Sequence, residues 1–175
     1  RYKIIPWGSS RISLKLNEEE LFANLKGKWR NMLRKAQNYN LNIKCYNGTS
    51  DQVLDVIDAY KSFQHKKKFT GISDKLLISL SEQSSDYWKF FVYLAYSNQK
   101  GTALHNEPDG VLISVVSGNI ATYLIGFTNN VGRKYNANYL MLWQAIIDAK
   151  KTGCNWFDLG GINENTSKGI AHFKG

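Results

Sequence analysis

Cationic side chains gather at two places in the first half of the sequence. Lys26, Arg30 and Arg34 recur every four residues, a spacing that puts them on one stripe of a helix. Residues 65–69, HKKKF, place three lysines between two rings just before Gly71. Both patterns favour capture of an anion such as a phosphate, and both are equally typical of a solvated helix surface.

Acid–base candidates are few. Asp158 is the only acid in the segment WFDLGGI, where it is a candidate general base. The alternative is a carboxylate that holds the loop after a strand by accepting backbone N–H bonds. His172 could accept a proton at neutral pH. The sequence lacks GxSxG, P-loop, GxGxxG and HExxH patterns. It therefore lacks the reacting groups of the hydrolases, kinases, dinucleotide-binding proteins and zinc proteases that carry those patterns.

Two cysteines are present, Cys45 and Cys154, and they form neither a CxxC pair nor a zinc-like spacing with a histidine. We expect both to be ordinary buried thiols. No metal and no cofactor is predicted.

The elements that must position these residues centre on segment 119–161. Residues 120–127 are β-branched and aromatic, apolar residues then recur at helical spacing across 139–147, and Trp156 to Leu159 resume a strand pattern. Lys150 and Lys151 suit the last turn of the helix, and Gly153 suits its stop. This order predicts a βαβ unit. Its turn, 128–138, is where such a unit presents a ligand site.

The remaining segments complete the predicted architecture. Residues 12–16 alternate as a strand, and Asn17 with Glu20 forms a capping box that begins one long helix. A strand follows at 41–46, Ser50 caps a second helix, and a short helix begins at Asp74. Segments 87–96, 111–116 and 120–127 read as an antiparallel meander. The fold class is therefore α/β (α+β), a mixed, mainly antiparallel sheet with a βαβ core and flanking helices.

Size and charge narrow the possibilities. The 175 residues, 43% of them hydrophobic, suit one domain with a real core. Of the net charge of +9, residues 1–75 supply +8, from 15 Lys/Arg and 7 Asp/Glu. This asymmetry favours an anionic partner. No apolar run is long enough to span a bilayer and no signal peptide is evident, so a cytoplasmic protein is expected. The chain opens with Arg1, and we expect it to be a piece of something longer.

Three segments resemble a known family. WRNMLRKAQ (29–37), NANYLMLWQAIIDAKKTGCNWFDLGGI (136–162) and GIAHFKG (169–175) are similar to the FemA, FemB and FemX aminoacyltransferases, which build peptidoglycan cross-bridges on a GNAT-like fold. The resemblance covers most of the chain, as one GNAT-like domain over 1–175, and maps onto the second of two such halves. It implies a missing N-terminal half.

The resemblance implies a reaction and its partners. An amino acid would pass from aminoacyl-tRNA to an amine on the stem peptide of a peptidoglycan precursor, lipid-linked or nucleotide-linked, with peripheral contact at the inner face of the membrane. An aminoacyl ester is already activated, so its aminolysis needs alignment and stabilisation of an oxyanion rather than an enzyme nucleophile. That requirement fits a sequence without a catalytic Ser or Cys constellation.

Site residues follow from the same resemblance. The family's closing FK motif falls on Phe173 and Lys174, where the lysine would stabilise negative charge or the tRNA end and the phenylalanine would stack on a base or ribose. Tyr123 would contact the precursor, although read alone it suits a core. Lys66, with Lys67 beside it, falls near the family's basic position for the precursor diphosphate. Arg30 and Arg34 of the first basic stripe are added as substrate-binding candidates.

One departure leaves alternatives open. Ordinary GNAT acetyltransferases cradle a pyrophosphate in an Arg/Gln-x-x-Gly-x-Gly/Ala turn, and residues 133–138, RKYNAN, have Asn136 where a glycine would allow close approach. Coenzyme A binding is therefore disfavoured. Two rivals remain: a coenzyme A- or carrier-dependent N-acyltransferase, and a noncatalytic module that binds RNA or anionic lipid.

Overall fold

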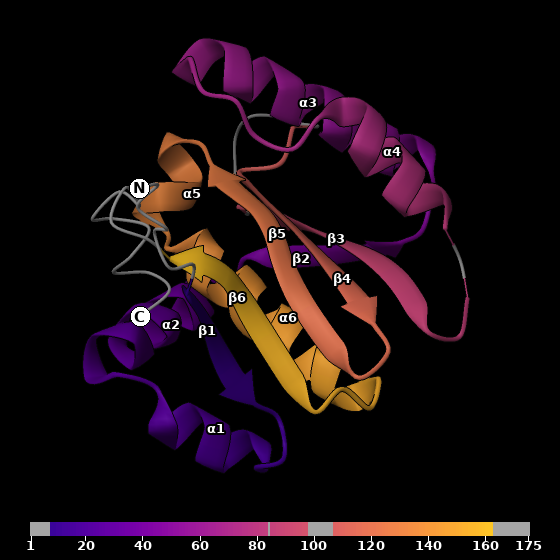
Figure 1. Ribbon diagram of the computed structural model, residues 1–175. Coiled ribbons are helices and arrows are strands. Elements are labelled where there is room, and N and C mark those ends of the chain that lie inside the picture. Colours follow the sequence, from indigo (N-terminus) through magenta and orange to yellow (C-terminus); the bar gives the residue numbers. More distant parts are fainter. Residues whose placement is uncertain (1–7, 84, 98–106, 163–175) are drawn as a thin grey trace, which may run out of the picture.

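The computed structural model describes residues 8–83, 85–97 and 107–162 (Figure 1). A six-stranded sheet runs in the order β1-β6-β5-β4-β3-β2. Every neighbouring pair is antiparallel except β5 and β6, which are parallel. The elements are β1 (Gly8–Ser13), α1 (Glu18–Asn24), α2 (Gly27–Asn38), β2 (Asn42–Asn47), α3 (Asp51–Lys67), α4 (Asp74–Glu82), β3 (Trp88–Tyr96), β4 (Gly110–Ser117), β5 (Ile120–Thr128), α5 (Asn130–Lys134), α6 (Ala137–Lys151) and β6 (Trp156–Ile162).

The predicted fold class is confirmed by this arrangement. The β3–β4–β5 meander, the tight turn at Gly118, and the β5–α6–β6 crossover all lie where the sequence pattern places them. The capping box is also present, because the Glu20 N–H donates to Asn17 and the Asn17 N–H donates to Glu20, each at 2.9 Å. Ser50 caps α3 as expected.

Helices cover the sheet in two layers (Figure 1). On one face, α6 packs against β3, β4 and β6 with α1 and α2 alongside it; the largest buried side chains of this core are Tyr93, Leu112, Met141, Leu142, Ile146 and Phe157. On the other face, α3 and α4 bury a second core that contains Val53, Ile57, Leu77, Phe90 and Ile113. The sheet thus separates the helices that carry the two cationic groups, α2 and α3.

The expected long first helix is wrong, because the structure breaks it into α1 and α2. Leu25 and Lys26 take extended ψ angles of 144° and 140° at the break. The Arg30 guanidinium donates to the carbonyl oxygens of Ala23 and Leu25, which satisfies groups that the end of α1 leaves open. A weak helix former, Gly27, stands at the start of the second helix.

Two smaller differences concern the sheet edges. The first strand ends at Ser13 rather than continuing to residue 16, although Leu14 stays buried and its N–H donates to the Asn155 carbonyl at 2.9 Å. Cys154 is buried as expected, whereas Cys45, on the edge strand β2, is exposed.

The turn between β5 and α6 contains an unexpected short helix, α5. Asn129 caps it by accepting the Gly132 N–H at 2.8 Å, while its amide donates to Asp109 at 2.9 Å. A Cβ built on Gly132 would lie 2.1 Å from the Asp109 carbonyl oxygen, so only glycine lets α5 approach the start of β4 this closely. This contact fixes where α6 begins.

We predict that Gly132→Ala lowers the free energy of unfolding by about 1–3 kcal/mol, because an added methyl collides with backbone rather than with a yielding side chain. Urea denaturation measures the change. Gly27→Ala is the matched control, since the nearest atom to its Cβ would be a guanidinium nitrogen of Arg30 at 4.0 Å. That variant should be unchanged or slightly stabilised. A Gly132→Ala protein as stable as the wild type would contradict the close approach.

Candidate active site

The candidate site lies where β5 and β6 stop pairing. Their parallel register comprises Ile120 with Trp156, Ala121 with Phe157 and Thr122 with Asp158. Both strands continue beyond this point, β5 to Thr128 and β6 to Ile162, while each keeps its other neighbour in the sheet. The backbones of β5 and β6 therefore diverge, and no shared ladder joins them beyond Thr122 and Asp158.

Asp158 stands at the last paired position. One carboxylate oxygen accepts from the Arg11 Nε at 2.9 Å and from the Ser9 hydroxyl at 3.2 Å, and the other accepts from the Gly160 N–H at 2.8 Å. Its side chain is 11% exposed, against 54% for Arg11. Gly160 has a φ of +78°, a conformation that suits glycine and that turns the backbone toward the carboxylate.

Burial alone raises the pKa of the Asp158 carboxyl. The N–H of Gly160, the guanidinium of Arg11 and the hydroxyl of Ser9 together outweigh burial, so the pKa is lowered from its ordinary value. A carboxylate with a lowered pKa and three donors on it is a weak proton acceptor. This geometry suits the alternative, a loop-holding carboxylate, better than it suits a general base. The general-base role of Asp158 stays a prediction.

Tyr123 lies just past the last β5–β6 pair, beside a bulge in the β4–β5 register. Its ring packs against the core beneath α6. A Cβ built on Gly126 would lie 2.2 Å from the Tyr123 hydroxyl oxygen. The hydroxyl therefore lies beside Gly126, in the part of β5 that no longer pairs with β6. Burial, with a smaller contribution from Tyr60, raises the pKa of Tyr123, which keeps the hydroxyl protonated at neutral pH.

Lys66 and Lys67 are the last residues of α3, and both are exposed. Phe63 of the same helix stacks on Phe127 near the end of β5, with ring centroids 4.9 Å apart. Tyr60 also stacks on Phe127, at 6.0 Å. These contacts hold the end of α3 over the end of β5, so the two lysines lie at the same end of the sheet as the divergence.

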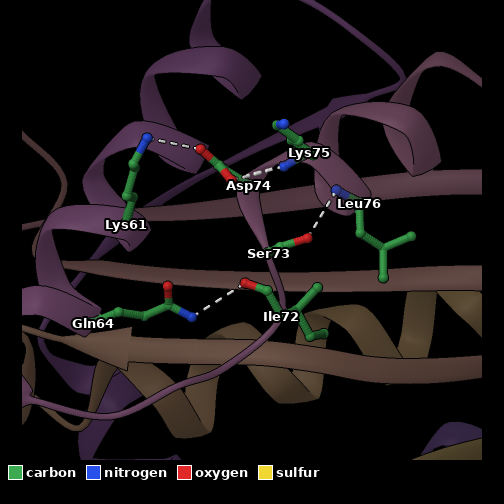
Figure 2. A network of polar contacts seen from close by, with 7 residues as sticks. All are labelled: Lys61, Gln64, Ile72, Ser73, Asp74, Lys75 and Leu76. Carbon is green, nitrogen blue, oxygen red and sulfur yellow. Dashed lines mark hydrogen bonds and ion pairs between the residues drawn. The ribbon is translucent and has the colours of Figure 1, made fainter.

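The connection from α3 to α4 secures this placement (Figure 2). The Gln64 amide donates to the Ile72 carbonyl at 3.1 Å, and Lys61 pairs with Asp74 at 2.8 Å. Within the described ranges, the only ion pairs are Lys61–Asp74 and Arg11–Asp158. Neither of these pairs involves Lys66 or Lys67.

Arg30 and Arg34 are placed elsewhere. Arg30 closes the end of α1, as described above, and the Arg34 guanidinium lies 5.2 Å from the ring centroid of Phe22. Both belong to the layer that contains α6, on the opposite side of the sheet from α3 (Figure 1). The structure does not bring the two cationic groups together, and a substrate-binding role for the arginines stays a prediction.

Phe173 and Lys174, together with His172, lie outside the described residues. Conversely, sequence reasoning missed Arg11 and Ser9 as the partners of Asp158. They precede it by 147 and 149 residues, and no local pattern links residues so far apart.

Among the residues described, no helix has the length and apolar character needed to cross a bilayer. The same ranges contain no group of three or more His, Cys, Asp or Glu side chains placed to hold a metal ion.

The mixed sheet with its diverging parallel pair defines a GNAT-like fold. A tandem GNAT protein from the clavulanic acid biosynthesis pathway shares it, with a TM-score of 0.52 and 10% identity over 97% of this chain and 49% of that one. The likeness is stronger to the crystal structure of FemX, with a TM-score of 0.72 and 13% identity over 95% of this chain. Residues 105–175 match the FemAB family model. The predicted resemblance to FemAB-type proteins is thereby confirmed.

The chain spans 57% of the FemX chain that it matches. A further structural relative is the C-terminal domain of a protein from Agrobacterium fabrum named provisionally as a lysylphosphatidylglycerol synthetase, with a TM-score of 0.57 and 11% identity over 89% of this chain and 46% of that one. No curated protein matches the sequence.

We predict that Asp158→Asn lowers stability at neutral pH and that the loss fades in acid. Because the folded-state pKa lies below the unfolded value of about 3.9, the carboxylate stabilises the fold above that value. The contribution disappears as pH falls through the folded pKa. Urea midpoints of wild type and variant should therefore differ at pH 7 and converge as the pH falls below the folded-state pKa. Equal midpoints at pH 7 would refute the loop-holding role.

Proposed function

We propose that this chain is the acyl-transferring half of an aminoacyltransferase that moves an amino acid from aminoacyl-tRNA to an amine on the stem peptide of a peptidoglycan precursor. The observation that carries the proposal is the divergence of β5 and β6 after Thr122 and Asp158, inside the segment that matches the FemAB family. The FemX-like fold and the excess of positive charge support it.

The divergence suits an extended peptide. Residues of β5 beyond Thr122 and residues of β6 beyond Asp158 share no ladder, so a stem peptide would pair along the edge of β5. The exposed lysines at the end of α3 would bind the precursor diphosphate, since a lysine acts as a point charge toward phosphate. The Tyr123 hydroxyl would then donate to the peptide or to the phosphate.

The reaction balances without an enzyme nucleophile. The neutral acceptor amine attacks the ester carbonyl, the new C–N bond forms, and the C–O bond to the ribose breaks. The amine gives up one proton, which the departing ribose oxygen finally takes. Negative charge develops on the carbonyl oxygen in between, and a lysine ammonium close to it lowers the barrier. Lys174 is our candidate for that cation, and Phe173 is our candidate for stacking on the terminal base or ribose.

Asp158 has a supporting role in this scheme. By fixing Gly160 and the start of the divergent part of β6, it would hold one wall of the site. Proton removal would then fall to the substrates and to solvent, because the carboxylate is occupied by its three donors. The second wall would come in part from another GNAT-like half, in keeping with the fraction of FemX that the chain spans.

A donor linked to coenzyme A remains the second candidate, favoured by one observation. Asn136 has a φ of +56°, the left-handed conformation that a glycine would favour and that asparagine tolerates. The backbone turn of an acetyltransferase can thus form without the glycine. Calorimetry with acetyl-CoA distinguishes the donors, because micromolar binding would favour coenzyme A.

The proposed donor and precursor also suggest a location. Charged tRNA and nucleotide-linked precursors are cytoplasmic, and a lipid-linked precursor would bring the chain to the inner face of the membrane. This location depends on the proposed function and falls with it.

We predict that Lys174→Ala lowers the rate of transfer about 10²- to 10³-fold, as expected for loss of an oxyanion stabiliser. The assay follows a labelled amino acid from charged tRNA to a muropeptide precursor, with any partner half supplied. Lys151→Ala, a change of an exposed lysine at the end of α6, is the control and should leave the rate unchanged. Full activity of Lys174→Ala would remove that residue from the mechanism, and absence of transfer by the wild type would count against the function itself.

A further inference from the structure

A pair of tyrosines joins the end of α2 to the start of α6. The rings of Tyr39 and Tyr135 meet edge to face, with centroids 4.7 Å apart. Tyr39 nevertheless remains 47% exposed. The Lys134 ammonium lies 5.3 Å from the Tyr135 ring centroid, and Lys35, also exposed, precedes Tyr39 by about one helical turn. We call Lys35, Tyr39, Lys134 and Tyr135 the tyrosine platform.

Positive charge dominates the segments that build this platform. Residues 21–50 and 110–147 contain no aspartate or glutamate. The first of these segments carries six Lys/Arg. Asp109 approaches α5, but its carboxylate accepts from the Ser97 N–H at 2.8 Å and from the Asn129 amide at 2.9 Å. No ion pair among the described residues involves Lys35 or Lys134. The platform therefore offers cations next to an accessible ring.

That combination matches single-stranded nucleic acid. Aromatic faces stack on bases, and neighbouring lysines neutralise phosphates. A purely structural role explains the contact between the rings, yet packing alone gives no reason for the Tyr39 side chain to remain nearly half exposed. An anionic lipid surface would use the lysines, but a tyrosine pair held edge to face offers little apolar surface for insertion.

The place of the platform in the fold also fits an RNA end. Tyr135 belongs to the short connection from β5 to α6, so the platform lies at the end of the sheet where β5 finishes. The divergence of β5 and β6 opens toward the same end. An RNA strand seated on the platform would therefore lie at the end of the sheet that the proposed reaction uses.

We propose that the tyrosine platform binds the single-stranded end of an RNA, with a base on Tyr39 and phosphates on Lys35 and Lys134. The inference rests on the proposed function only in that the RNA would be the aminoacyl-tRNA donor. Binding of RNA itself can be measured without any transfer reaction.

The test is fluorescence anisotropy of the 175-residue chain with a labelled single-stranded RNA octamer that ends in CCA. Tyr39→Ala should weaken binding at least about fivefold, the lower end for one stacked base, whereas Tyr39→Phe should keep it. Lys35→Ala with Lys134→Ala should reduce the slope of log K against log salt by about 1.4, as for two phosphate contacts on a single strand. Circular dichroism confirms that each variant is folded.

Tyr87→Ala and Lys75→Ala are the matched controls, because Tyr87 is 77% exposed and both lie away from α2 and α6. Each should bind RNA like the wild type. The proposal is overturned if Tyr39→Ala binds like Tyr87→Ala, or if the wild type does not bind the octamer. It is also overturned if the platform variants lose binding only to vesicles of phosphatidylglycerol.

The transfer assay separates this inference from the proposed function. If the protein binds RNA through the platform but transfers no amino acid, the proposed RNA site is supported and the aminoacyltransferase function is refuted. If Tyr39→Ala changes neither amino-acid transfer nor RNA binding, the proposed RNA site is refuted and the aminoacyltransferase function is supported.

Discussion

The architecture of the site depends on one carboxylate. Asp158 accepts from Arg11 and Ser9 on β1 and from Gly160 on its own strand, at the position where β6 leaves β5. A strand that gives up one neighbour loses ladder hydrogen bonds and must be held from its other side. Here β1 supplies that support by pairing along β6 as far as Ile162. The opening between β5 and β6 can persist because β6 is fastened to β1.

The sheet divides the positive charge of the first half of the chain between two layers. The lysines at the end of α3 belong to one face and the cations of α2 to the other, with the sheet between them (Figure 1). Under the proposed function both substrates, the aminoacyl-tRNA and the peptidoglycan precursor, are anionic and must be kept apart until their reacting atoms meet. An arrangement with one cationic surface on each face, and an opening between β5 and β6, assigns each substrate its own approach under the proposed function.

The sequence allowed prediction of most of the architecture because its signals are local. Hydrophobic periods, the capping box at Asn17, and the turn at Gly118 each depend on residues a few positions apart. The break at Leu25 and Lys26 escaped prediction because it is stabilised by Arg30, which reaches back to carbonyls that an unbroken helix would have used itself. For the candidate site, family resemblance offered Tyr123 and Lys66, whose roles stay predictions, but it gave no indication of Arg11, which pairs with Asp158. Arg11 reaches Asp158 only because β1 pairs with β6 in the folded sheet.

That meeting has a consequence for the order of assembly. The contacts between β1 and β6 join residues nearly 150 positions apart, as in the 149-residue separation of Ser9 and Asp158. During synthesis β1 is made long before β6, its partner. It therefore stays unpaired while the β3–β4–β5 meander folds from residues that are close in sequence. Closure of the sheet is then the late event, and the same ion pair that shapes the site would mark its completion.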